Sequence, residues 1–149
     1  MELNLRFKEF YLLELLQLKM YQSQVDSLQN EYIRAAYERM IQLEQLHVNF
    51  YYQLLMEHKQ KIPTIPGGVM SLVGMFIGEL VDLTSAENRY KLGVAVENKA
   101  IEMYRALIIE TADKPELQKR LWHNMIDEEF HLLWFKDNQK HATSLVKST

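Results

Sequence analysis

The chain has 149 residues, of which 48% are hydrophobic and 25% charged, a composition typical of a globular domain rather than a disordered chain or a membrane bundle. It contains no cysteine, which excludes a disulfide scaffold, a thiolate zinc site, an iron–sulfur centre and a cysteine nucleophile. The net charge of −3 does not favour nucleic acid as a partner.

Helix breakers are rare, with five glycines and three prolines in the whole chain, and this scarcity predicts long helices. The first ten residues carry several charges and lack the continuous apolar core of a signal peptide. The longest apolar stretch, 69–81, is interrupted by Glu79 and is shorter than the roughly 20 residues of a transmembrane helix. We therefore expect a cytoplasmic protein with no transmembrane segment.

Two helices are predicted in the first half of the chain, over about residues 3–27 and 30–60. Steps of three and four residues define one core-facing side of each helix. The first face consists of Phe7, Tyr11, Glu14, Leu18, Tyr21 and Val25. The second consists of Ile33, Tyr37, Met40, Glu44, His47, Tyr51 and Leu54. Polar residues 26–30 predict a short turn between the helices, and Pro63 and the sequence Pro66-Gly67-Gly68 predict the end of the second.

Residues 61–84 form a crossover that is too long for a tight turn and can hold a short helix of its own. We expect its apolar part to lie on the neighbouring helices or at an oligomer interface, with Gly74 and Gly78 allowing close backbone approach. The alternative is an entry surface for an apolar substrate or a membrane, although flanking lysine and arginine residues are missing.

Two further helices are predicted over about 85–112 and 114–138. Thr84 with Glu87, and Asp113 with Glu116, form candidate capping boxes at their starts, and Pro115 suits a first helical turn. The third face consists of Tyr90, Val94, Glu97, Ile101, Tyr104 and Ile108. The fourth consists of Leu117, Leu121, Asn124, Glu128, His131 and Phe135. After Gln139 we expect only a short polar tail.

Four helices of similar length, joined by two short turns and one long crossover, predict an all-α fold. We expect an antiparallel four-helix bundle of two helical hairpins, forming one domain over residues 1–149.

Each predicted core face carries a glutamate at its middle, where an apolar residue belongs: Glu14, Glu44, Glu97 and Glu128. The second and fourth faces add a histidine three residues later, His47 and His131. Burying an isolated carboxylate costs several kcal/mol, and the same faces contain no lysine or arginine. Two divalent cations would balance the four negative charges, so the pattern predicts a two-metal site.

The spacing supports this interpretation. Glu14 and Glu44 lie at similar distances from the first turn, and Glu97 and Glu128 at similar distances from the second, so each pair is level across its hairpin. The two halves also repeat, because a tyrosine, Tyr21 or Tyr104, follows the first glutamate of each by seven residues.

A glutamate on the first and third helices, with Glu-x-x-His on the second and fourth, resembles the ferritin-like di-iron carboxylate superfamily over about residues 7–137. Val96-Glu97 with Ile101 and Tyr104 resembles the third helix of rubrerythrins and of demethoxyubiquinone hydroxylases. The segment from Glu14 to Tyr21-Gln22-Ser23-Gln24 and the length of the crossover resemble the latter family.

The resemblance implies two iron ions, with manganese as the alternative metal. Glu44 and Glu128 would bridge the ions, Glu14 and Glu97 would be terminal ligands, and His47 and His131 would each supply one nitrogen. Rubrerythrins often carry a further carboxylate at the position of Ala100, so this extra ligand is not expected here.

Three further side chains are candidates for supporting the ligands. By the same resemblance, Asp127 would accept the ring N–H of His47 and fix its tautomer. Tyr21 and Tyr104 would donate to the terminal glutamates, the alternative being simple core packing.

The function expected from the resemblance is binding of Fe(II) and its oxidation by O2 or peroxide, which limits oxidative stress. Peroxidase turnover would need an external electron donor, because a chain without cysteine has no rubredoxin-like centre. The alternatives are a di-iron monooxygenase that hydroxylates a lipophilic substrate and a non-catalytic metal-binding subunit. Because the tail after Gln139 is short for the additional helix of cage-forming ferritins, we expect a small homo-oligomer, with a dimer favoured.

Overall fold

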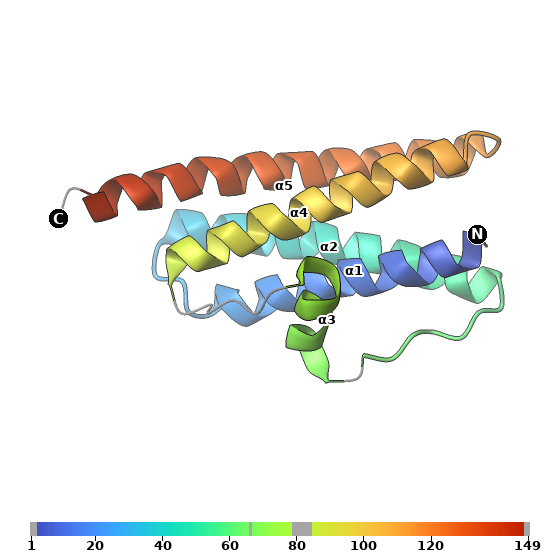
Figure 1. The fold of residues 1–149 in the computed structure, drawn as a ribbon, viewed down its shortest axis with the longest axis horizontal. Coiled ribbons are helices and arrows are strands. Elements are labelled where there is room, and N and C mark those ends of the chain that lie inside the picture. The colour runs from blue at the N-terminus through green and yellow to red at the C-terminus, as the bar shows by residue number, and fades with distance from the viewer. Residues whose placement is uncertain (1–2, 66, 79–84, 148–149) are drawn as a thin grey trace. The chain divides into compact units, whose positions relative to one another are not determined.

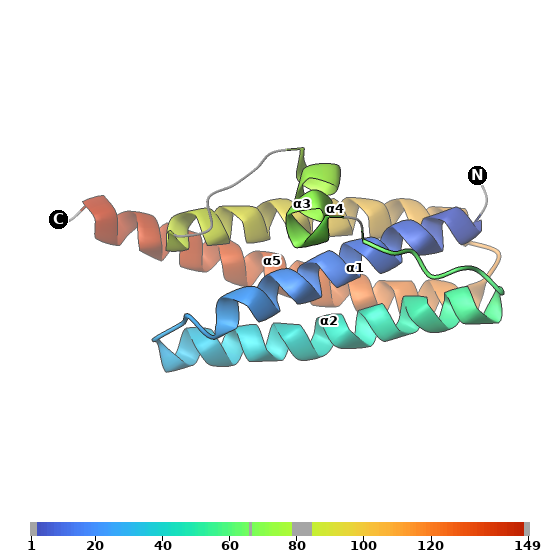
Figure 2. The same cartoon turned by 90° about the horizontal axis from the view of Figure 1, so that it is seen from below.

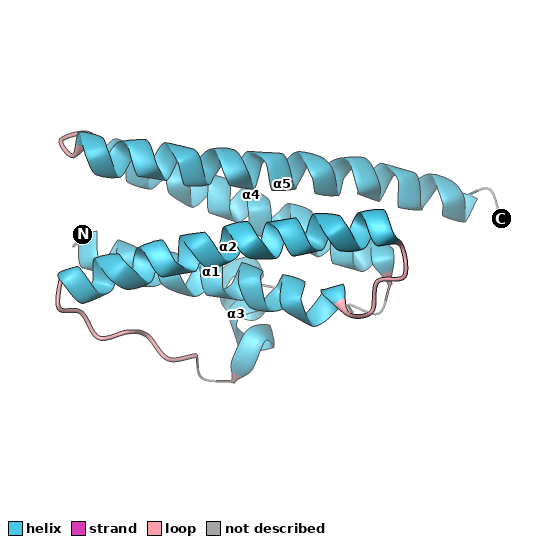
Figure 3. Ribbon diagram, turned by 180° about the vertical axis from the view of Figure 1, so that it is seen from behind, coloured by secondary structure: helices cyan, strands magenta, loops and turns pink. Residues whose placement is uncertain are grey.

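The computed structural model describes residues 3–65, 67–78 and 85–147. Within these ranges it contains five helices and no strand (Figure 3), so the predicted all-α class is confirmed. The chain divides into two compact units, Met1–Phe76 and Ile77–Thr149, each built around one helical hairpin. None of the described helices is long and apolar enough to cross a lipid bilayer.

The first hairpin consists of α1 (Leu3–Val25) and α2 (Glu31–Glu57), which run side by side (Figures 1 and 2). Its turn is closed by Asn30, whose side chain accepts a hydrogen bond from the N–H of Ile33 at 3.1 Å and caps α2. Beside the turn, the buried hydroxyl of Tyr37 donates to Oε1 of Gln24 at 2.9 Å and ties the two helices together.

The end of α2 is set by local hydrogen bonds, and it comes three residues before the predicted position. The N–H of Lys59 donates to the carbonyl of Met56 at 3.0 Å, and that of Gln60 donates to the carbonyl of Leu55 at 2.8 Å. Together these bonds form a Schellman motif. It requires Lys59 to adopt a left-handed conformation, with φ of 53°. The helix therefore ends before Pro63 is reached.

The predicted short helix of the crossover is present as α3 (Gly68–Ile77). Gly78 follows it with φ of 81°, a conformation that glycine adopts without strain. A Cβ atom at Gly74 or Gly78 would meet nothing within 4 Å among the described residues, so the expected close backbone approach at an interface stays a prediction.

The second hairpin consists of α4 (Ala86–Glu110) and α5 (Pro115–Lys147). Ser85 caps α4 by accepting from the N–H of Asn88 at 3.1 Å, so the expectation that Thr84 is the cap is wrong; Thr84 itself lies outside the described residues. Pro115 opens α5 as predicted. Beside it, Asp113 accepts from the Lys114 amine at 2.8 Å, a hydrogen bond that lowers the pKa of the carboxyl.

Helix α5 continues to Lys147, so the predicted end near residue 138 is wrong. Residues 139–147 are polar but contain no glycine or proline that would stop a helix. The amide of Asn138 donates to the carbonyl of Trp134 at 2.8 Å and thus bonds within the helix. Polarity alone was therefore a poor signal for a helix end.

Candidate metal centre

The predicted core faces are buried at their centres, and the acidic residues there are among the least exposed side chains of the described residues. Several outer members of these faces are only half-buried: Tyr11, Val25, Ile33, Leu54, Val94, Ile108 and Leu117. Glu14, Glu44, Glu97 and Glu128 are each 0% exposed. His47 and His131 are 1% and 3% exposed. All six lie near the middle of long helices rather than on loops, so regular backbone fixes where each side chain begins.

The first ligand cluster, on the hairpin of α1 and α2, consists of Glu14, Glu44 and His47. One ligand atom from each lies within 4.8 Å of the others. Nδ1 of His47 is 3.4 Å from Oε2 of Glu14 on the opposite helix and 3.5 Å from Oε2 of Glu44 on its own helix. Residues 14 and 44 are therefore level across the hairpin, as the spacing predicts.

The second ligand cluster, on the hairpin of α4 and α5, consists of Glu97, Glu128 and His131, again with ligand atoms within 4.8 Å of one another. Nδ1 of His131 is 3.5 Å from Oε1 of Glu97 and 3.3 Å from Oε2 of Glu128. The two hairpins thus repeat the same arrangement of donor atoms, with matching distances that differ by no more than 0.2 Å.

These separations suit donors that share one metal ion. They exceed the usual N–H···O distance of about 2.7–3.2 Å. Two donors each about 2.1 Å from an ion would be about 3.0 Å apart at a right angle and about 3.4 Å apart at the tetrahedral angle. Carboxylate and imidazole donors suit iron, manganese or zinc. Each cluster can therefore hold a divalent metal ion.

The charge of each cluster leads to the same interpretation. Within each hairpin two carboxylates face a single imidazole. With both carboxylates ionised, a cluster carries −2 if its histidine is neutral and still −1 if the histidine is protonated. Such a surplus is costly in a buried position. A divalent cation bound by a neutral imidazole and two carboxylates brings the total to zero, which neither protonation state of histidine achieves.

Aromatic layers lie on both sides of the first ligand cluster. On one side the rings of Phe10 and Tyr51 stack with centroids 5.0 Å apart. On the other side Tyr21 and Tyr37 meet edge to face at 5.8 Å. Tyr21 and Tyr51 each lie seven residues, or two helical turns, after a ligand glutamate, and both are fully buried. The layers hold α1 and α2 in register at the ligands.

The second ligand cluster has similar layers with different chemistry. On one side the rings of Tyr90 and Phe135 lie 6.3 Å apart. On the other, the side-chain amide of Asn124 donates to the hydroxyl of buried Tyr104 at 3.2 Å. Sequence reasoning included Asn124 in the core face but gave it no role. An amide at a core position four residues before a ligand was the signal that could have found it.

The remaining predictions concern supporting residues. Tyr104 makes the hydrogen bond to Asn124, and Tyr21 packs on Tyr37; their predicted donation to glutamates stays a prediction. Asp127 is half-buried on α5, and its proposed contact with His47 joins two different hairpins and likewise stays a prediction. Ala100 is fully buried, and Glu102 is 73% exposed beside Lys99, so neither supplies a further ligand.

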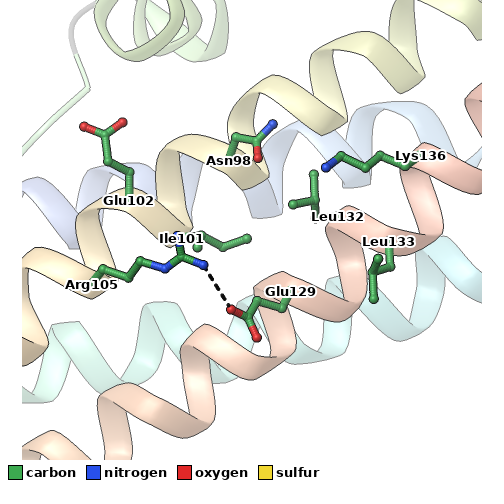
Figure 4. Close-up of a pocket in the computed structure, with 8 residues that line it drawn as sticks. All are labelled: Asn98, Ile101, Glu102, Arg105, Glu129, Leu132, Leu133 and Lys136. Atoms are coloured by element: carbon green, nitrogen blue, oxygen red, sulfur yellow. Dashed lines mark ion pairs between the residues drawn. The ribbon is translucent and has the colours of Figure 1, made fainter.

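A groove of about 530 Å³ lies on the second hairpin between α4 and α5 (Figure 4). Each helix contributes the residues one, four, five and eight positions after its ligand glutamate. Arg105 and Glu129 form an ion pair of 3.6 Å within it. The lining contains none of the six ligand residues, so the groove is a separate surface feature.

No known family model matches the chain, and no curated protein or solved structure matches it either. The assignment of the site therefore rests on the residues and geometry described above.

Proposed function

We propose that the protein is a ferritin-like di-iron protein that binds Fe(II) and oxidises it with O2 or peroxide. The observation that supports this proposal most directly is the duplicated cluster of two buried carboxylates and one histidine, with Nδ1 3.3–3.5 Å from the carboxylate oxygens in both hairpins. The duplication matters because a single cluster of this kind could hold one metal ion, whereas two clusters could hold the two ions of a di-iron site.

In this proposal the two hairpins pair as a four-helix bundle with their ligand clusters facing each other. Glu14, Glu44 and His47 of one hairpin and Glu97, Glu128 and His131 of the other would hold the ions, with Glu44 and Glu128 as the bridging ligands that the resemblance implies. Support comes from the sequence, in which the four glutamates occupy equivalent levels of the two hairpins, and from the charge, since two divalent ions balance four carboxylates. Manganese is the alternative metal, because the same donors suit it.

Two Fe(II) ions supply two electrons, which is the number needed to reduce O2 to hydrogen peroxide with two protons, or peroxide to two waters with two protons. The chain's contribution is to hold both ions in a buried, mostly apolar interior and to limit the access of water to the reacting oxygen species. Release of Fe(III) or its reduction by an external donor completes the cycle.

Oxidation of Fe(II) under air tests the proposal. We expect the purified protein to bind about two ions per chain and to oxidise Fe(II) faster than buffer does, and Glu44→Ala to abolish this acceleration. Glu38→Ala is the matched control, since Glu38 is an exposed residue of the same helix that pairs with Arg34. Equal rates for the two variants, or no binding of transition metal, would refute the proposal.

A second candidate, hydroxylation of a lipophilic substrate, is favoured by the exposed apolar side chains of α3. Met70 and Met75 are 39% and 57% exposed, although most neighbours in this helix are apolar. A hydroxylase would form product only with a reductant and an apolar substrate. A non-catalytic site would show neither activity, but a large loss of thermal stability when the metal is removed.

A further inference from the structure

A line of exposed apolar side chains runs along α5 on the side opposite the second ligand cluster. Trp122, Ile126, Phe130 and Leu133 are 46%, 44%, 67% and 57% exposed. At 100° per residue these four fall within an arc of about 80°, whereas Glu128 and His131 point the other way. We call these four residues the α5 stripe. The exposed large apolar residues of α2, including Leu46 and Met56, are spread over a much wider arc and form no such line.

We propose that the α5 stripe is the interface of a homodimer in which two copies of α5 pack antiparallel about a two-fold axis at residue 128. The proposal is independent of the metal function, since it rests on the opposite face of the helix. We propose a second copy of this chain as the partner because, when two stripes run antiparallel, their side chains match in size and in charge.

Size is the first part of this complementarity. Trp122 lies six residues before position 128 and Leu133 five after it, while Ile126 and Phe130 lie two before and two after. An antiparallel pair thus places each large aromatic ring against an aliphatic side chain of the other copy, with both contacts made twice. A parallel pair would instead stack tryptophan on tryptophan and phenylalanine on phenylalanine.

Charge is the second part. Lys119 and Asp137 are exposed, lie nine residues before and after position 128, and project at the same angle around the helix. Antiparallel packing therefore brings each lysine to an aspartate of the other copy at both ends of the stripe. A parallel pair would oppose lysine to lysine and aspartate to aspartate. Glu129, which comes near its own copy at the centre, is paired with Arg105 on α4 (Figure 4).

The area is adequate for a dimer of moderate affinity. The exposed parts of the four side chains amount to about 400 Å² per copy, given the 150–250 Å² that large aromatic side chains bury. Standard interfaces bury about 800 Å² per partner, with a polar rim around an apolar centre. The groove beside the stripe and the charged residues along α5 can supply that rim.

Sedimentation velocity across a micromolar dilution series tests the interface. We expect a reversible dimer whose dissociation constant rises at least tenfold in Phe130→Glu, with the helical circular dichroism unchanged. Leu46→Glu is the control, because Leu46 is 54% exposed on α2 and outside the stripe. A monomeric wild-type protein, or equal dimerisation of Phe130→Glu, would overturn the proposal. So would a monomer that pellets with anionic phospholipid vesicles, which would assign the stripe to a membrane surface.

A charge exchange and a distance measurement test the orientation. Lys119→Glu and Asp137→Lys should each weaken the dimer about threefold to tenfold, and the double variant should recover it. Since the chain has no cysteine, a single Lys119→Cys site can carry a spin label, measured at a protein concentration well above the dissociation constant because the substitution removes the Lys119 charge. The two labels should be about 27 Å apart along an antiparallel pair, as 18 residues of helix require, but about 10 Å apart in a parallel one. The short distance, or failure of the double variant to recover, would contradict the antiparallel pairing.

Discussion

Replacing Glu44 with glutamine should make the metal-free protein more stable and the metal-loaded protein less stable, a reversal that few other interpretations of the cluster predict. Glutamine keeps the size of the side chain and removes its negative charge. In the first ligand cluster Glu14 and Glu44 have oxygens within 4.8 Å of each other. At an effective dielectric constant near 20, two such charges repel by about 3.5 kcal/mol.

The sign in the metal-free protein does not depend on the protonation of His47. If the imidazole is neutral, the substitution removes repulsion together with the cost of burying a charge. If the imidazole is protonated, the substitution removes its attraction to Glu44. Glu14 still pairs with the imidazole, and the net charge of the cluster falls from −1 to zero. We expect a net gain that does not exceed the repulsion of about 3.5 kcal/mol that the substitution removes. For a chain of this size, each kcal/mol corresponds to about 2–4 °C in Tm.

Bound metal should make the wild type more stable than Glu44→Gln, because the glutamine amide is a poor metal ligand. Metal at one hundred times its Kd stabilises the wild type by about 2.7 kcal/mol, and a hundredfold weaker Kd removes almost all of this gain. Differential scanning calorimetry of both proteins, with chelator and with Fe(II) or Mn(II) under anaerobic conditions, gives the four values required. Glu38→Gln, which removes an exposed partner of Arg34, should change Tm slightly and equally in both states. If Glu44→Gln lowers Tm in chelator, or leaves the metal-induced shift intact, the charge argument is wrong.

Three other predictions concern the stability of the helices. Gly93→Ala should destabilise the protein by about 1 kcal/mol despite alanine's better helix propensity, because the new Cβ would lie 2.8 Å from the buried ring of Phe135. Chemical denaturation should show that the double variant with Phe135→Leu loses less stability from the alanine than the single variant does. Lys59→Gly should stabilise by about 1 kcal/mol, since glycine adopts the positive φ of this position freely, and an unchanged or lower Tm would count against that explanation. Burial raises the pKa of Tyr90 and, with a smaller contribution from Tyr52, that of Tyr11. The stability that these phenols contribute is complete below pH 10 and is lost as the pH rises through their raised pKa values, so Tyr90→Phe should flatten the alkaline fall of Tm measured by calorimetry.

The ligand clusters were accessible to sequence reasoning because a helical hairpin converts linear spacing into position. Once the turn at 26–30 is recognised, the constant rise of a helix places Glu14 and Glu44 at one level, and His47 follows one turn later on the same face. The same reasoning applies to Glu97 and Glu128. Over this distance the predicted position of a side chain along and around a regular helix changes little. Glutamate and histidine at otherwise apolar core positions are also easy to recognise in the sequence.

The helix ends were less predictable because they depend on local competition. Ser85 and Thr84 are equivalent caps in composition, and the backbone geometry decides between them. Lys59 occupies a left-handed position that its residue type does not favour, so sequence gave no sign of the Schellman motif that ends α2. The hydrogen bond of Asn124 to Tyr104 depends on side-chain conformations, which spacing cannot supply.

The position of the donors also explains why metal should bind to a folded protein rather than fold it. Glu14 and Glu44 lie in the middle of α1 and α2, with the Phe10–Tyr51 stack on one side and the Tyr21–Tyr37 contact on the other. These layers bury large apolar rings whether or not an ion is present, and they hold the helices level at the carboxylates. A site built in this way opposes the repulsion between its donors with the packing energy of the hairpin. The metal-free chain should therefore remain helical and cooperative in unfolding, in contrast to small zinc domains whose fold forms only with the ion.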